Sequence, residues 1–216
     1  MLAADSPRQN AEDLLRTFLS DRDRIQKESR GGSKHRTIFL SEGISTWARE
    51  RFGDDVFTIS RSVGKHAMKR EYLLDLMVFQ KGKVRPLVGA EFEWSNARDG
   101  KREKQDTLFE LLLPGEKRPF RDAAQKDRAF DLLKVLVATP EIGVFGGWEN
   151  SRRGDAMTCE SLLDGDRWLL ESFAKSLTIE PLYLLYLAFV RPGRGKRHEF
   201  KPVLFGMRKQ GLEELR

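Results

Sequence analysis

Apolar positions in the first quarter of the chain recur at helical spacing. Residues 10–29 carry apolar side chains roughly every three to four positions, which predicts a helix. Residues 41–52 repeat the pattern, with Ser41 as the expected N-terminal cap and Gly53 as the expected stop. The intervening segment, 30–36, contains glycine and serine and predicts a loop.

Short apolar runs typical of strands come next. The first is 56–60. Two longer runs, YLLDLMVF at 72–79 and PLVGAEFEW at 86–94, flank a turn that contains Gly82. Two such runs around a short turn predict a β-hairpin.

The second half alternates helical and strand patterns. Helices are predicted at 119–138 and 160–176, and strands at 142–146, 182–190 and 202–207. This order of elements predicts an α/β sandwich with a mixed central sheet flanked by helices. The long helix between two strands predicts one crossover connection.

Three acidic residues interrupt the apolar strands of the hairpin. Asp75 lies within YLLDLMVF, and Glu91 and Glu93 lie within LVGAEFEW. Residues two apart on a strand point to the same face, roughly 7 Å from each other. A buried carboxylate costs several kcal/mol unless it is paired, protonated or bound to a cation, and neither strand contains a basic partner. Carboxylate oxygens are the ligands of hard divalent cations such as Mg²⁺.

An acid in one strand, a hairpin, Glu-x-Glu in the next strand, and then a helix and a strand resemble the PD-(D/E)XK nuclease superfamily. The matching residues are Asp75 and Glu91-Phe92-Glu93. The resemblance implies a restriction-endonuclease-like fold in a single domain over 1–216, with the nuclease-like core at 41–148. The remaining parts would be an N-terminal helix within 1–40 and an added helix and hairpin within 149–216.

The resemblance also implies roles for these residues. Asp75, Glu91 and Glu93 would be the catalytic acids and the ligands of Mg²⁺ or Mn²⁺. The third position is usually lysine, whereas here it is Glu93, so a lysine from elsewhere could substitute, and Lys126 and Lys104 are the candidates. The proline that usually precedes the aspartate is replaced by Leu74.

A structural alternative stays open for the acids, because buried carboxylates in strands are often paired with a distant arginine. Arg61, Arg70 and Arg121 are available for this. A second alternative is a catalytically silent member of the same fold that binds nucleic acid or a protein, and the glutamate at position 93 keeps it open.

Charge favours a polyanionic partner. The formal net charge is +6, and basic residues flank the acidic strands in sequence. DNA is therefore the expected partner. The candidate nucleic-acid-binding residues are Lys65, Lys69, Arg98, Lys101, Arg102, Lys104 and Arg121.

Other features narrow the class of protein. There is one cysteine, Cys159, so no internal disulfide is expected. No apolar run approaches the roughly 18–20 residues of a membrane span, and no secretory signal is evident. We therefore expect a cytoplasmic protein without a membrane partner and, by analogy with restriction enzymes, a homodimer. The expected function is metal-dependent endonucleolytic hydrolysis of DNA, of restriction or defence type.

Overall fold

The computed structural model describes residues 6–60, 74–94, 109, 120, 122–150, 157–177, 181–191 and 198–215. The helices are α1 (Pro7–Ser20), α2 (Arg22–Glu28), α3 (Ser33–Phe52), the short 3₁₀ helix η1 (Gly53–Asp55), α5 (Ala123–Val137) and α6 (Cys159–Ser176). The strands are β1 (Val56–Ser60), β2 (Leu76–Gln80), β3 (Val88–Glu93), β4 (Ile142–Asn150), β5 (Leu182–Arg191), β6 (Glu199–Arg208) and β7 (Gly211–Leu215).

The seven strands form one mixed sheet in the order β1 to β7, so each strand lies beside its neighbours in sequence. β1, β2 and β3 are antiparallel to one another, β3, β4 and β5 run parallel, and β6 and β7 return antiparallel. The predicted mixed sheet and the predicted hairpin of β2 and β3 are confirmed. Helix α5 is the predicted crossover, from β3 to β4, and α6 makes a second one from β4 to β5.

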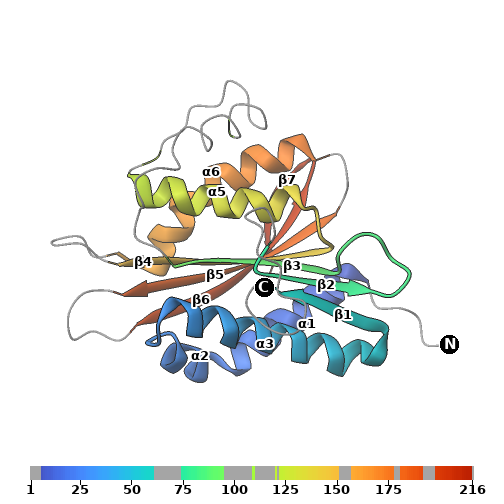
Figure 1. The fold of residues 1–216 in the computed structure, drawn as a ribbon. Coiled ribbons are helices and arrows are strands. Elements are labelled where there is room, and N and C mark those ends of the chain that lie inside the picture. Colours follow the sequence, from blue (N-terminus) through green and yellow to red (C-terminus); the bar gives the residue numbers. More distant parts are fainter. Residues whose placement is uncertain are drawn as a thin grey trace.

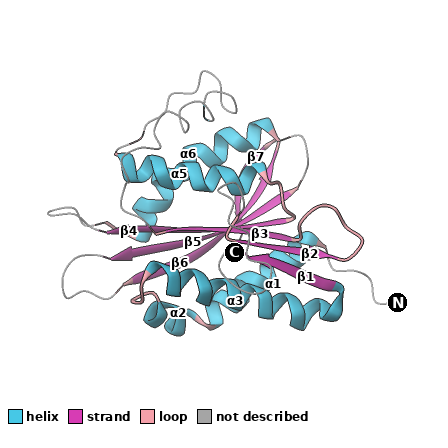
Figure 2. Cartoon of the chain, in the orientation of Figure 1, coloured by secondary structure: helices cyan, strands magenta, loops and turns pink. Residues whose placement is uncertain are grey.

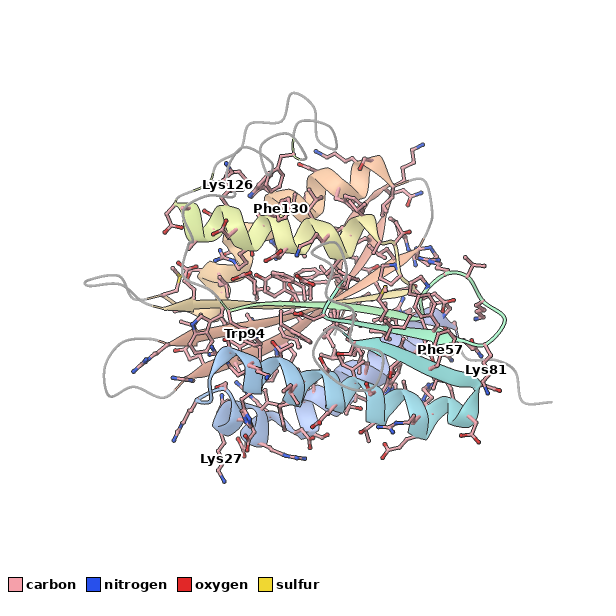
Figure 3. The ribbon with its side chains drawn as sticks, viewed as in Figure 1. Lys27, Phe57, Lys81, Trp94, Lys126 and Phe130 are labelled. Carbon is pink, nitrogen blue, oxygen red and sulfur yellow. The ribbon has the colours of Figure 1, made fainter. Side chains whose placement is uncertain are left out.

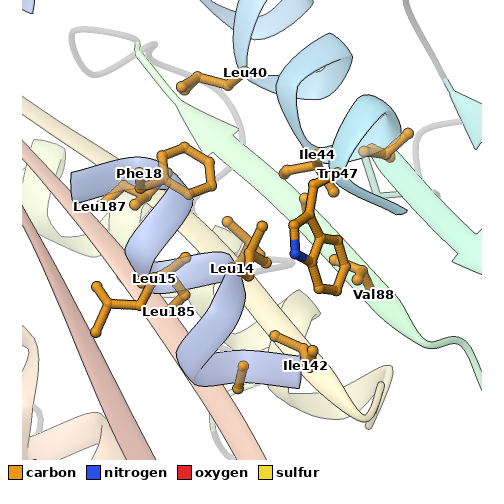
Figure 4. Packing of buried hydrophobic residues seen from close by; sticks show 14 of the residues in the cluster. Leu14, Leu15, Phe18, Leu40, Ile44, Trp47, Val88, Ile142, Leu185 and Leu187 are labelled. Atoms are coloured by element: carbon orange, nitrogen blue, oxygen red, sulfur yellow. The ribbon is translucent and has the colours of Figure 1, made fainter. Parts of the chain in front are cut away.

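Helices cover both faces of the sheet, as Figures 1 and 2 show: α1, α2 and α3 lie against one face, and α5 and α6 against the other. Side chains alternate along each strand and supply two separate cores. Figure 4 shows the core under the N-terminal helices, where Leu14 and Trp47 pack toward Val88, Ile142 and Leu185. The core on the other face contains Leu133 of α5 and Leu169 of α6.

The predicted start of the second helix is wrong. Helix α3 begins at Ser33, after an N-cap at Gly32, and Ser41 is buried in its middle. Thr37, Leu40, Ser41 and Ile44 are all buried at a helical spacing, so one continuous face packs on the sheet and the helix does not break. The expected helix at 10–29 is divided at Asp21 into α1 and α2.

A buried ion-pair network joins α5 to α6 and the sheet. The Arg128 guanidinium donates through Nε to Asp166 Oδ2 at 2.8 Å and through Nη1 to Glu149 Oε2 at 3.0 Å. The Tyr186 hydroxyl donates to the same Asp166 oxygen at 2.5 Å. Arg128 is 2% exposed and Asp166 is fully buried, so water contributes little to balancing these charges and the ion pairs balance them instead. This network fixes α5 against the sheet.

The Arg128→Met variant tests this anchoring. Removal of the cation leaves the buried acids Asp166 and Glu149 without the guanidinium that they share, which we expect to lower the free energy of unfolding by roughly 3–5 kcal/mol. Urea titration followed by circular dichroism measures the loss. The control is Arg167→Met on α6, where the exposed guanidinium faces Asp164 and Glu214, and a loss below about 1 kcal/mol is expected. Equal losses in both variants would contradict the anchoring role.

Candidate active site

Asp75 and Glu91 are adjacent at the end of the β2–β3 hairpin. The register pairs Leu76 with Ala90, so Asp75, at a bend just before β2, faces Glu91 on β3. The Asp75 backbone N–H donates to Glu91 Oε2 at 3.0 Å, and the Phe92 backbone N–H donates to Asp75 Oδ2 at 3.0 Å. Each carboxylate thus accepts a hydrogen bond from the backbone of the neighbouring segment. The predicted position of Asp75 in the middle of a strand is wrong, because β2 begins at Leu76.

Lys134 from helix α5 supplies a positive charge to this pair. Its Nζ donates to Glu91 Oε1 at 2.5 Å and also forms an ion pair with Asp131 one turn earlier. Lys134 reaches Glu91 because α5 crosses over β3 on its way to β4. The cation therefore comes from a helix 43 residues further along the chain and not from either strand.

Glu91 lies in an environment that disfavours its ionised form. Burial and the neighbouring charge of Asp75 raise its pKa to about 8, although Lys134 acts in the opposite direction. Asp131 raises it further. The pKa of Lys134 is lowered by burial but raised by more through Glu91 and Asp131, so Lys134 stays protonated. The pair of carboxylates is incompletely neutralised by the lysine.

Glu93 lies two residues after Glu91, on the same face of β3, and is half-buried. In the described ranges, no group of three or more histidine, cysteine, aspartate or glutamate side chains is placed to hold a metal ion. Of the three predicted acids, the structure therefore brings Asp75 and Glu91 into contact and leaves Glu93 beside them on the strand.

Lys126, the predicted substitute lysine, is not at Glu91. It lies in the first turn of α5, half-buried, and Figure 3 shows it on the side of the helix away from the sheet. The eight residues that separate it from Lys134 span about 12 Å of helix axis. Lys134 could have been found in the sequence, because it is a single charge within the apolar run LLKVLV.

The seven predicted nucleic-acid-binding residues all lie outside the described residues: Lys65, Lys69, Arg98, Lys101, Arg102, Lys104 and Arg121.

The donor set fits a hard divalent cation such as Mg²⁺ or Mn²⁺. Asp75 and Glu91 offer carboxylate oxygens, which are the ligands that such ions prefer. Burial and then the charge of Asp75 raise the pKa of Glu91, and a bound dication would offset both effects.

Among the helices of the described segments, none combines the length and apolar character required to cross a bilayer. No model of a known protein family matches the chain, and neither a curated protein nor a solved structure matches it.

Proposed function

We propose that this protein is a metal-dependent nuclease that hydrolyses phosphodiester bonds of DNA. The observation that carries the proposal is the position of two buried acids, Asp75 and Glu91, which are joined through backbone hydrogen bonds at the end of the hairpin. A lysine from the crossover helix contacts one of them. A hairpin, a helix and a parallel strand in this order support a restriction-endonuclease-like fold.

In this proposal Asp75 and Glu91 hold Mg²⁺ or Mn²⁺. When bound, such an ion supplies Lewis-acid stabilisation of charge on the phosphate and lowers the pKa of a coordinated water. Lys134 orients the Glu91 carboxyl group and opposes the rise in its pKa. Glu93, half-buried on the same face, accepts a proton from the attacking water.

Cleavage of plasmid and single-stranded DNA with Mg²⁺ or Mn²⁺ tests the function. Asp75→Asn and Glu91→Gln keep the shape of each side chain but remove its charge, and we expect each to lower the cleavage rate by roughly 100-fold or more. Glu171→Gln, at an exposed acid on α6, is the control and should cut like the wild type. DNA binding without cutting under any metal would favour the catalytically silent alternative.

The stability of the metal-free protein should fall as pH rises from about 5 to about 8. The folded-state pKa of Glu91, about 8, lies above its ordinary value of 4.5, so the folded protein binds the proton more tightly than the unfolded chain across this window. Ionisation of Glu91 then lowers the free energy of unfolding, on the order of 1–3 kcal/mol.

Urea titrations at pH 5 and pH 8, with and without Mg²⁺, measure this effect. Glu91→Gln should remove that part of the pH dependence, and Mg²⁺ should restore stability at pH 8 in the wild type only. If Mg²⁺ stabilises the variant as much as the wild type, the ion binds elsewhere.

The Lys134→Met variant distinguishes the roles of Lys134 and Lys126, the two lysines of α5. Without Lys134 the pKa of Glu91 rises further, so cleavage should fall by about 10-fold or more at neutral pH and recover partly at higher pH. The matched control is Lys126→Met, with an expected change below about twofold. Rate–pH profiles of both variants give the comparison, and a larger loss in Lys126→Met would assign the role to that lysine.

A further inference from the structure

A guanidinium is stacked between two tryptophans on the other face of the sheet. Arg36 Cζ lies 4.5 Å from the ring centroid of Trp94 and 4.3 Å from that of Trp148. Arg36 is in the first turn of α3, whereas the tryptophans lie at the carboxyl ends of β3 and β4. Figure 3 shows Trp94 on the side of the N-terminal helices. Each indole is only 9% exposed, so the rings hold the guanidinium and are not free to stack on another molecule.

The charge of Arg36 is not balanced by an acid in the described part of the chain. Its Nη1 donates to the Ser29 carbonyl at 3.3 Å, and its Nε is buried without an acceptor. Burial lowers its pKa to about 10, and no neighbouring carboxylate raises it. The nearby Glu28 accepts from His35 Nε2 at 2.7 Å. A partly buried cation with unused donors is a site for an anion.

Other basic groups surround this arginine. His198 is in edge contact with Trp148, with centroids 5.1 Å apart, and its Nδ1 is 3.2 Å from the Ser29 hydroxyl. Arg30 directly follows Ser29, and Arg191 follows Val190, which pairs with Glu199 next to His198. Burial lowers the pKa of His198, and the charges of Arg191, Arg30 and Arg36 lower it further. Arg30 and Arg191 are exposed.

These residues share one edge of the sheet with the candidate active site. Trp94 directly follows Glu93, the last residue of β3, and it packs on the face of Phe92, opposite to that of Glu93. Arg191 ends β5 at this edge, on the face of Phe189 and the N-terminal helices. The adjacent acid, Glu199, alternates with the buried Phe200 and faces the other side, near Cys159 of α6.

We propose that Arg36, fixed by Trp94 and Trp148, forms with Arg30, Arg191 and His198 a binding site for the phosphate backbone of a nucleic acid. The inference extends the proposed nuclease function, because a strand bound here passes the edge at which Glu93 lies. A guanidinium has five N–H donors, of which the Ser29 carbonyl takes one, and the exposed Arg30 and Arg191 flank it as successive phosphates require. Such a contact contributes affinity and register, but not sequence preference.

The test is binding of a fluorescent 30-base-pair duplex to the full chain in EDTA, where no cleavage occurs, followed by anisotropy at several salt concentrations. Arg36→Met should weaken binding about 10-fold, and the slope of log K against log salt should fall by about one. Arg30→Ala and Arg191→Ala, at exposed positions, should each weaken binding by about threefold or more. The matched control, Arg167→Met, removes a guanidinium that lies 5.9 Å from the Phe205 ring on the opposite face, and should bind within twofold of the wild type.

Three outcomes decide the proposal. Circular dichroism establishes that each variant is folded, and if Arg36→Met is not folded, the exposed Arg30 and Arg191 variants carry the test. Unchanged affinity in the folded variants would overturn the proposal. Stronger competition by polyglutamate than by unlabelled duplex would also overturn it and would indicate an acidic protein partner. If the wild type binds the duplex without cutting DNA and the variants lose this binding, the nuclease proposal fails and the phosphate site stands.

Discussion

Helix α5 carries two cations toward the sheet, the buried Arg128 and the half-buried Lys134, and the position of the helix depends on the acids that they contact. Arg128 is fixed near the start of the helix by Asp166 and Glu149, and Lys134 reaches Glu91 near its end. A buried charge without a partner is far costlier than an exposed one, so the helix has little freedom to slide or rotate. The same helix brings Lys134 to Glu91, so the ion pairs of Arg128 also help to position the candidate site.

At the carboxyl ends of the parallel strands, the candidate active site on one face of the sheet lies near the Arg36 site on the other face. On the α5 face, β3 carries Glu91 and Glu93, whereas on the other face Trp94 and Trp148 hold Arg36. Alternation along a strand is sufficient to produce this division. A polyanion that lies across the edge can therefore meet fixed positive charge on one side of the sheet and acidic groups on the other. Binding and hydrolysis would use separate residues, so each can be disabled without the other.

The hairpin acids were predictable because a charge in an apolar strand is conspicuous in the sequence alone. The identity of their partner was not, because Lys134 is distant in sequence and its contact depends on how α5 crosses the sheet. Strand β4 was predicted too short, since Gly146 and Gly147 suggest a break. In the structure a Cβ at Gly147 would lie 2.6 Å from the Tyr186 hydroxyl and 3.0 Å from Arg128 Cδ, so glycine there makes room for the buried network.

Two further differences have local causes. Ser41 suggested a helix cap, but the burial of Thr37 and Leu40 extends α3 backward to Ser33. Strand β7 was not predicted, because Gly211–Leu215 has two exposed acids, Glu213 and Glu214, and little apolar alternation. This edge strand is held in the sheet by its pairing with β6 more than by burial of its own side chains. The Arg36 site also lay outside the sequence prediction, since stacking of a helical arginine on two strand tryptophans is a long-range arrangement.

The sequential order of the seven strands has a consequence for how the chain acquires its structure during synthesis. Every strand can pair with the one made just before it, so the sheet can grow at one edge as the chain leaves the ribosome. The two N-terminal helices α1 and α2 are exceptions. Helix α2 packs on β6, and α1, which precedes it, packs on β5 and β6, both of which are made late. The buried face of α1, including Leu14 and Phe18, must wait for more than 150 residues to be added. The N-terminal helix is therefore the part most exposed to chaperones and to misassociation before translation is complete.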